Sequence, residues 1–132
     1  MMLETALLVT ALLFGGMTLY AFGFAAFVFG ALPAEEAGRL IRRAFPRFYL
    51  FVFVTSAVAA ILAASKDPLS AAVLVAVAAT TVVARQGLMP AINAASDTGA
   101  KTRFKVLHGI SVALTLGHIA GAAGVLLRLA AA

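Results

Sequence analysis

The side chains best suited to chemistry lie in one segment, "FKVLHGISVALTLGHIAG", at residues 104–121. His108, Ser111, Thr115 and His118 are separated by three, four and three residues, so they share one stripe if this segment is helical. Two imidazoles could ligate a metal or haem, and an imidazole beside a hydroxyl could move protons. However, the two histidines would lie about 15 Å apart along a helix, at about 1.5 Å per residue, which is too far to share one ion.

Other ligands for a metal are scarce. The chain has no cysteine and no third histidine. A haem or copper centre would therefore need Met17, Met89 or a second protomer. We expect no metal site and no cofactor, and we interpret the histidines as hydrogen-bonding groups.

The acidic side chains argue against catalysis. A proton-coupled transporter normally carries a carboxylate inside the membrane, and an enzyme needs paired carboxylates or a nucleophile with an orienting partner. A Ser111–His108 pair has no third member at its depth, so we expect no enzymatic activity. All five acids lie outside the long apolar stretches: Glu4, Glu35, Glu36, Asp67 and Asp97.

The elements that carry these residues are predicted to be membrane-spanning helices. The chain is 64% hydrophobic and 11% charged, and its mean hydropathy is +1.08, which is too apolar for a soluble domain of 132 residues. Backbone groups in lipid must be paired within the segment, so spans of this length are helices. The sequence predicts an all-α, four-helix membrane bundle in a single domain, residues 1–132, with spans at about 4–32, 48–65, 69–89 and 104–128.

Basic residues predict the orientation. Eight of the ten lie in or beside the first and third connectors, which share one side of a four-span protein. The positive-inside rule then places both connectors in the cytoplasm, and both termini on the periplasmic side of a bacterial inner membrane. The basic residues of these two connectors are Arg39, Arg42, Arg43, Arg47, Arg85, Lys101, Arg103 and Lys105.

The first connector, "PAEEAGRLIRRAF", has helical features of its own. Pro33 suits a helix start, and Ala37, Ile41 and Phe45 form an apolar stripe opposite the arginines. We predict a short amphipathic helix on the cytoplasmic surface, ended by Pro46. Its arginines would anchor the topology and contact headgroups, and specific recognition of an anion or an acidic lipid is the alternative.

Polar residues are predicted near the middle of every span. They could form a polar binding site at the midplane, although interhelical hydrogen bonds explain them as well. This midplane layer comprises Thr18, Tyr20, Thr55, Ser56, Thr80, Thr81, Thr115 and His118.

Glycines mark the faces that can approach closely. Gly16, Gly23 and Gly30 recur every seven residues in the first span, and Gly117 and Gly121 form a small-xxx-small pair in the fourth. These faces pack the bundle, and one seam could remain for a second copy or a partner.

Three stretches resemble the transmembrane protein 205-like family: "LFGGM" at 13–17, "LPAEEAGRLIRRAFPRFY" at 32–49 and "INAASDTGAKTRFKVLHGIS" at 92–111. The likeness covers nearly the whole chain. It implies a four-helix membrane protein, whose relatives have been tied to drug or metal tolerance without an established transport reaction. The most distinctive positions are Gly16, Pro33, Ala37, Gly38, Phe45, Pro46, Tyr49, Asn93, Asp97, Phe104, His108 and Ser111.

Polar residues flanking the two connectors on the basic side could also meet. We predict a polar cytoplasmic vestibule, in which Asp97 pairs with an arginine and Asn93 caps His108, with a structural clamp as the alternative. Its residues are Arg42, Arg43, Arg47, Asn93, Asp97, His108 and Ser111.

Two functions follow from these features. The first is a non-catalytic accessory or assembly subunit of a membrane complex, whose partners are the bilayer and either another membrane protein or a second copy. The second is a small oligomeric transporter or tolerance factor for a metal ion or organic solute. Nucleic acid is not an expected partner, because the basic residues lie at span ends and no single-strand-binding module is visible.

Overall fold

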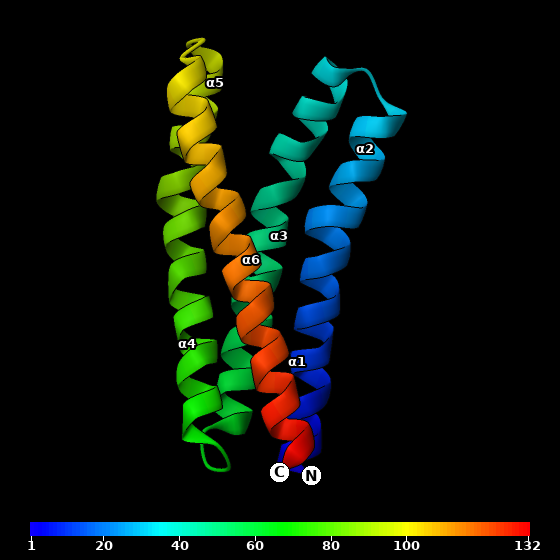
Figure 1. Cartoon of the computed structure of the whole chain (residues 1–132), viewed down its shortest axis with the longest axis vertical. Coiled ribbons are helices and arrows are strands. Elements are labelled where there is room, and N and C mark those ends of the chain that lie inside the picture. Colours follow the sequence, from blue (N-terminus) through cyan, green and yellow to red (C-terminus); the bar gives the residue numbers. More distant parts are fainter.

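Four long helical rods run antiparallel to their neighbours in the chain (Figure 1). The computed structural model describes all residues from 1 to 132. Each rod is long and apolar enough to cross a membrane. The first rod contains α1 (Met2–Thr18), η1 (Leu19–Phe24) and α2 (Ala25–Ala31); the second is α3 (Ala34–Ala63); the third contains α4 (Pro68–Val83), η2 (Ala84–Leu88) and α5 (Met89–Asp97); the fourth is α6 (Lys101–Ala131).

The predicted all-α, four-helix membrane fold is therefore confirmed. The first and third connectors lie at one end of the bundle, which we call the basic end, and both termini lie at the other (Figure 1). Around the bundle, α3 packs between α1 and α4, while α6 closes the ring by packing against α1, α4 and α5.

The second rod differs from the prediction at Pro46. Residues 34–45 are helical as expected, but they do not form a separate helix that ends at the proline: α3 continues through Pro46 to Ala63. Proline removes one backbone donor. Ala44, two residues before the proline, and Phe48, two residues after it, are both buried. A continuous helix keeps these two residues on one packed face. The second predicted span is thus the lower part of a longer helix.

The third rod also extends past its predicted end, and it contains a wider turn. In η2 the amide of Met89 donates to the carbonyl of Ala84, five residues earlier. Pro90 follows directly, and a proline ring in an ordinary helix clashes with the carbonyl four residues before it. The π-type turn shifts the register by one residue where that clash would fall. The π-type turn also sets the direction in which the Arg85 side chain projects from the helix.

The bundle core is built of small and medium side chains in the half of the molecule nearer the termini. Alanines bring the helix backbones close together, and larger residues fill the space between them. The larger core residues are Leu13, Met17, Phe48, Tyr49, Val52, Leu74, Val77, Val125 and Leu129. Toward the basic end, α2 and the start of α3 diverge from α5 and the start of α6 (Figure 1).

Specific local features shape two of the connectors. Gly99 has a φ of +70°, a left-handed conformation that favours glycine and reverses the chain between α5 and α6. At the other end, Asp67 is the N-cap of α4, where its carboxylate accepts the Ser70 amide and, at 2.7 Å, the Ser70 hydroxyl. The same carboxylate pairs with Arg128 of α6 at 2.9 Å.

Candidate functional site

An ion pair joins two helices at the basic end. The Nη2 atom of Arg42 on α3 lies 2.9 Å from the Oδ1 atom of Asp97 at the end of α5. The same nitrogen lies 3.4 Å from the carbonyl of Asn93, one turn earlier on α5. Both side chains remain partly exposed. Three residues assigned to the vestibule from the sequence thus meet in one contact.

His108 takes a different partner from the one expected. Its ring stacks on Phe104, one turn earlier on α6, with the ring centroids 5.7 Å apart and the planes nearly parallel. It makes no hydrogen bond to Asn93, so the proposed cap is absent, although both residues line the same pocket. The reason is geometric: residues four apart on one helix stack readily, whereas Asn93 belongs to a different helix.

Ser111 meets an aromatic residue that the vestibule prediction omitted. The hydroxyl of Tyr49 on α3 lies 3.2 Å from the hydroxyl of Ser111 on α6. Tyr49 is buried, so this bond satisfies a phenol that would otherwise be unpaired. The pair links the two helices that diverge toward the basic end.

Tyr49, His108 and Ser111 line a cleft between the first rod, α3, α5 and α6, which we call the lateral cleft. Its apolar part has a volume of about 270 Å³, and an adjoining polar part has a volume of about 120 Å³. Ile41, Phe45, His108 and Ser111 form the wall that both parts share. Arg42 and Asn93 lie on the polar side, whereas Phe22 and Phe29 lie on the apolar side.

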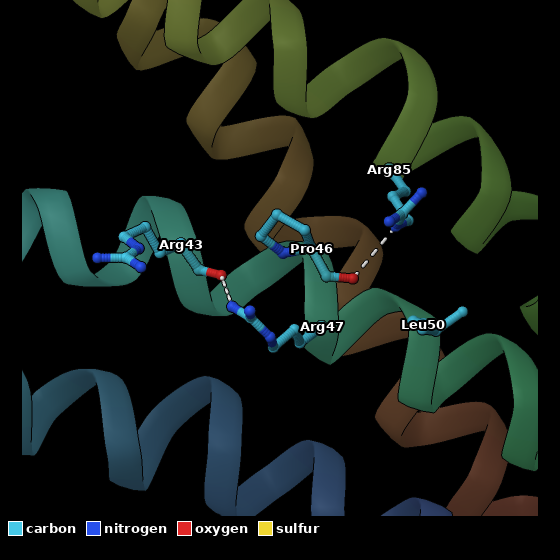
Figure 2. Close-up of a pocket in the computed structure, with 5 residues that line it drawn as sticks. All are labelled: Arg43, Pro46, Arg47, Leu50 and Arg85. Carbon is cyan, nitrogen blue, oxygen red and sulfur yellow. Dashed lines mark hydrogen bonds between the residues drawn. The ribbon is translucent and has the colours of Figure 1, made fainter.

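Arg43 and Arg47 do not join this cleft. They lie on the other side of α3, where they line a groove with Pro46, Leu50 and Arg85, which we call the arginine groove (Figure 2). The seven predicted vestibule residues therefore separate into two sites. The separation follows from helical geometry, because Arg42 and Arg43 are adjacent in sequence and point about 100° apart around the helix axis.

Sequence reasoning missed Arg85 as a member of either site. In the sequence it is only a flanking charge of the third connector. Its Nε atom donates to the carbonyl of Pro46 at 3.1 Å, so it crosses from η2 to α3. The available signal was Pro90, five residues later, which indicates a local change of helical register.

Most of the predicted midplane layer bonds within its own helix. The hydroxyls of Thr18, Thr55, Ser56 and Thr81 each donate to the carbonyl four residues earlier. Hydroxyls commonly satisfy themselves in this way in helices. These side chains consequently do not converge on one site.

The other four residues of that layer make contacts beyond their own helix turn or line the cleft. The Thr80 hydroxyl donates to the carbonyl of Ala76 on its own helix and also lies 2.7 Å from Nε2 of the buried His118, so it joins α4 to α6. Tyr20 donates to the carbonyl of Ala44 at 3.0 Å, which places it toward the basic end. Thr115 lines the apolar part of the lateral cleft.

The glycines divide into packed and open positions. A Cβ atom on Gly16 would lie 2.6 Å from the ring of Phe51, and one on Gly121 would lie 3.3 Å from Val73. At Gly23 such an atom would meet only Leu19 of its own rod. At Gly30 and Gly117 it would meet nothing within 4 Å.

The fold and these contacts define a class: a small polytopic membrane protein whose polar residues are concentrated at one end of a four-helix bundle. Residues 8–101 match the family model described as a domain of unknown function, DUF4149. The match covers more than half of the chain, so the chain belongs to this family. The more specific likeness to the transmembrane protein 205-like family stays a prediction. No curated protein and no solved structure matches the chain.

Proposed function

We propose that the protein is a small, non-catalytic subunit that associates with another membrane protein through the outer face of α6. One observation carries this proposal. Small residues recur on that face every three or four positions, and all of them are exposed. They are Gly109, Ala113, Gly117, Ala120 and Gly124.

The chemistry of this face favours a helix as the occupant. Around Gly109, Gly117 and Gly124, an added Cβ atom would meet nothing within 4 Å. Lipid chains fill such a surface no better than they fill a surface of large side chains, whereas a second helix gains close backbone contact and packing there. The bundle does not use this face itself, because α6 turns Thr115, His118 and Ala122 inward.

Two further parts of the proposal concern chemistry and orientation. The location of all five acids outside the long apolar stretches favours a non-catalytic role. The concentration of basic residues at one end supports placing that end in the cytoplasm and both termini on the periplasmic side of a bacterial inner membrane.

The test uses two glycines with open surroundings. Gly117→Leu places a large side chain on the α6 face, and Gly15→Leu places the same side chain on α1, where a Cβ atom also meets nothing. After crosslinking in native membranes and purification in mild detergent, the unmodified chain and Gly15→Leu should retain a larger membrane protein, and Gly117→Leu should lose it. Equal retention by both variants, or a complex that contains only this chain, would contradict the proposal.

The lateral cleft supports a second candidate function, the binding or transport of a small organic solute. It combines apolar walls with the polar groups of His108 and Ser111, a combination common in ligand sites. Val112→Trp would fill the apolar part while leaving the α6 small-residue face unchanged. A solute that copurifies with the unmodified chain and is lost in this variant would favour transport over the accessory role.

A further inference from the structure

The arginine groove concentrates positive charge at one place on the membrane-facing surface. Arg43 and Arg47 of α3 and Arg85 of η2 line a pocket of about 380 Å³. Figure 2 shows Arg85 reaching from its own helix to the carbonyl of Pro46, while Arg47 folds back toward the carbonyl of Arg43. Arg47 is held through one nitrogen, and Arg85 is held through Nε and, at 3.4 Å, through Nη1 on the side-chain oxygen of Gln86. Other N–H groups of each side chain are left to bind a ligand.

No carboxylate neutralises these three cations. Asp97 is paired with Arg42, on the side of the lateral cleft. Glu35 approaches Arg39 at 4.0 Å. Glu36 lies seven residues before Arg43, or about 10 Å along the helix axis. The groove therefore presents a net positive charge to whatever occupies it.

The groove continues into an apolar channel. A second pocket, of about 110 Å³, shares Leu50 and Arg85 with the first and continues between Phe53 on α3 and Val82 on α4. Leu50, Phe53 and Val82 are all exposed on the surface of the isolated chain. A ligand lying along both pockets would have an anionic end against the arginines and a hydrocarbon part against these side chains.

The depth of the arginines fits a lipid headgroup. Arg47 is followed by an uncharged stretch to Ser65, and Arg85 is preceded by an uncharged stretch from Leu69. Both guanidinium groups thus lie where the helices pass from apolar to polar sequence, which is the level of the phosphate groups in a bilayer. Arginine recognises phosphate through paired N–H donors.

We infer that the groove between α3 and η2 binds an anionic glycerophospholipid, with its phosphate on Arg43, Arg47 and Arg85 and an acyl chain along Leu50, Phe53 and Val82. This site is independent of the proposed α6 docking face, which lies on another helix. The apolar channel is the reason for choosing a lipid over a soluble phosphate, because a free anion would not use it.

The experiment compares two arginines that make no side-chain hydrogen bond. Arg43→Gln removes one groove cation without breaking a contact, and Arg103→Gln removes the same charge from an exposed position on α6 at the basic end. Delipidated full-length protein in neutral detergent is titrated with phosphatidylglycerol, and bound lipid is counted by native mass spectrometry. Phosphatidylcholine and inorganic phosphate serve as the other two probes.

We expect Arg43→Gln to weaken phosphatidylglycerol binding about fivefold, since a basic residue near the surface contributes about 1 kcal/mol toward an anionic lipid. Arg103→Gln should bind like the unmodified chain. Leu50→Asp should also weaken lipid binding, because it places a negative charge between the two pockets. Equal weakening by Arg43→Gln and Arg103→Gln would overturn the site in favour of general electrostatic attraction. Inorganic phosphate competing fully with the lipid, or phosphatidylcholine binding equally well, would overturn the proposed ligand.

Discussion

Arg42 on α3 and Asp97 on α5 form an ion pair at 2.9 Å that bridges two helices whose main packing is against other neighbours. Arg42 also lines the polar part of the lateral cleft, so the pair lies at the edge of that cleft. The side chains are 41% and 62% exposed, so water screens their attraction.

Breaking this pair should therefore change stability only modestly. We expect Asp97→Asn to lower the free energy of unfolding by about 0–1 kcal/mol, and less at high salt. The exchanged pair, Arg42→Asp with Asp97→Arg, should recover part of the loss. Thermal unfolding in detergent at two salt concentrations measures both effects. A loss that does not depend on salt would contradict the electrostatic explanation.

Adjacent glycines in α1 should respond very differently to the same substitution. Gly16→Ala places a methyl group 2.6 Å from the ring of Phe51, whereas Gly15→Ala meets nothing within 4 Å. Overpacking of this kind costs about 1–3 kcal/mol, so Gly16→Ala should lower the denaturation temperature. Gly15→Ala is the control and should match or slightly exceed the unmodified chain, because alanine has the higher helix propensity. Similar values for both variants would show that α1 and α3 are packed differently.

The contact between Thr80 and His118 should contribute to stability as an interhelical bond. Thr80→Val removes the hydroxyl that lies 2.7 Å from the imidazole while retaining the side-chain shape. Polar contacts between membrane helices average about 0.6 kcal/mol and reach about 1.7 kcal/mol. Thr18→Val is the matched control, because Thr18 bonds only to Phe14 of its own helix. Unfolding in detergent should rank Thr80→Val below Thr18→Val, and the reverse order would count against the bond.

Acid should weaken the end of the bundle that carries the termini. Hydrogen bonding from Arg128, and then from Ser70, holds the pKa of Asp67 well below its usual range. A carboxyl group whose pKa is lower in the folded state stabilises the fold above its unfolded pKa of about 4. That stabilisation is lost as the pH falls from about 4 through the lower pKa of the folded state.

The measurement is the pH dependence of the denaturation temperature. Asp67→Asn should flatten the acid side of this profile and lower the denaturation temperature at neutral pH, because the charged hydrogen bonds to Arg128 are lost. Glu36→Gln, at an exposed acid with no partner, should leave the profile nearly unchanged. If the profile of Asp67→Asn still falls as steeply as that of the unmodified chain, another group is responsible.

The sequence predicted the number of spans and the shared end of the two basic connectors because both depend on long-range composition. Uncharged stretches and clustered arginines are visible without any side-chain geometry. Pro46 was misjudged for the opposite reason. Proline removes one backbone hydrogen bond, which is a local cost. The buried residues before and after it gain more by staying on one continuous helix. That gain comes from packing against α1 and α4, which the sequence does not reveal.

Site residues were harder to predict than the elements that carry them. Helical spacing predicts which residues share a face, but it does not reveal which neighbouring helix meets that face. Arg42 and Arg43 were therefore grouped together, although they line different sites. The predicted partner of His108 is Asn93 on a different helix, whereas its ring stacks on Phe104 of its own helix. The midplane hydroxyls are compatible, from the sequence, with a shared polar site or with interhelical hydrogen bonds, but most of them donate to their own helix backbone.

The most direct test of the central claim is single-cysteine labelling, which is simple because the chain has no cysteine of its own. Gly38→Cys and Ser96→Cys report on the basic end, and Ser65→Cys and Ala132→Cys report on the opposite end. A membrane-impermeant maleimide applied to inverted and right-side-out vesicles should label the first pair only from the cytoplasmic side and the second pair only from the other side. Labelling of Gly38→Cys and Ser96→Cys from opposite sides would contradict a four-span bundle with one basic end.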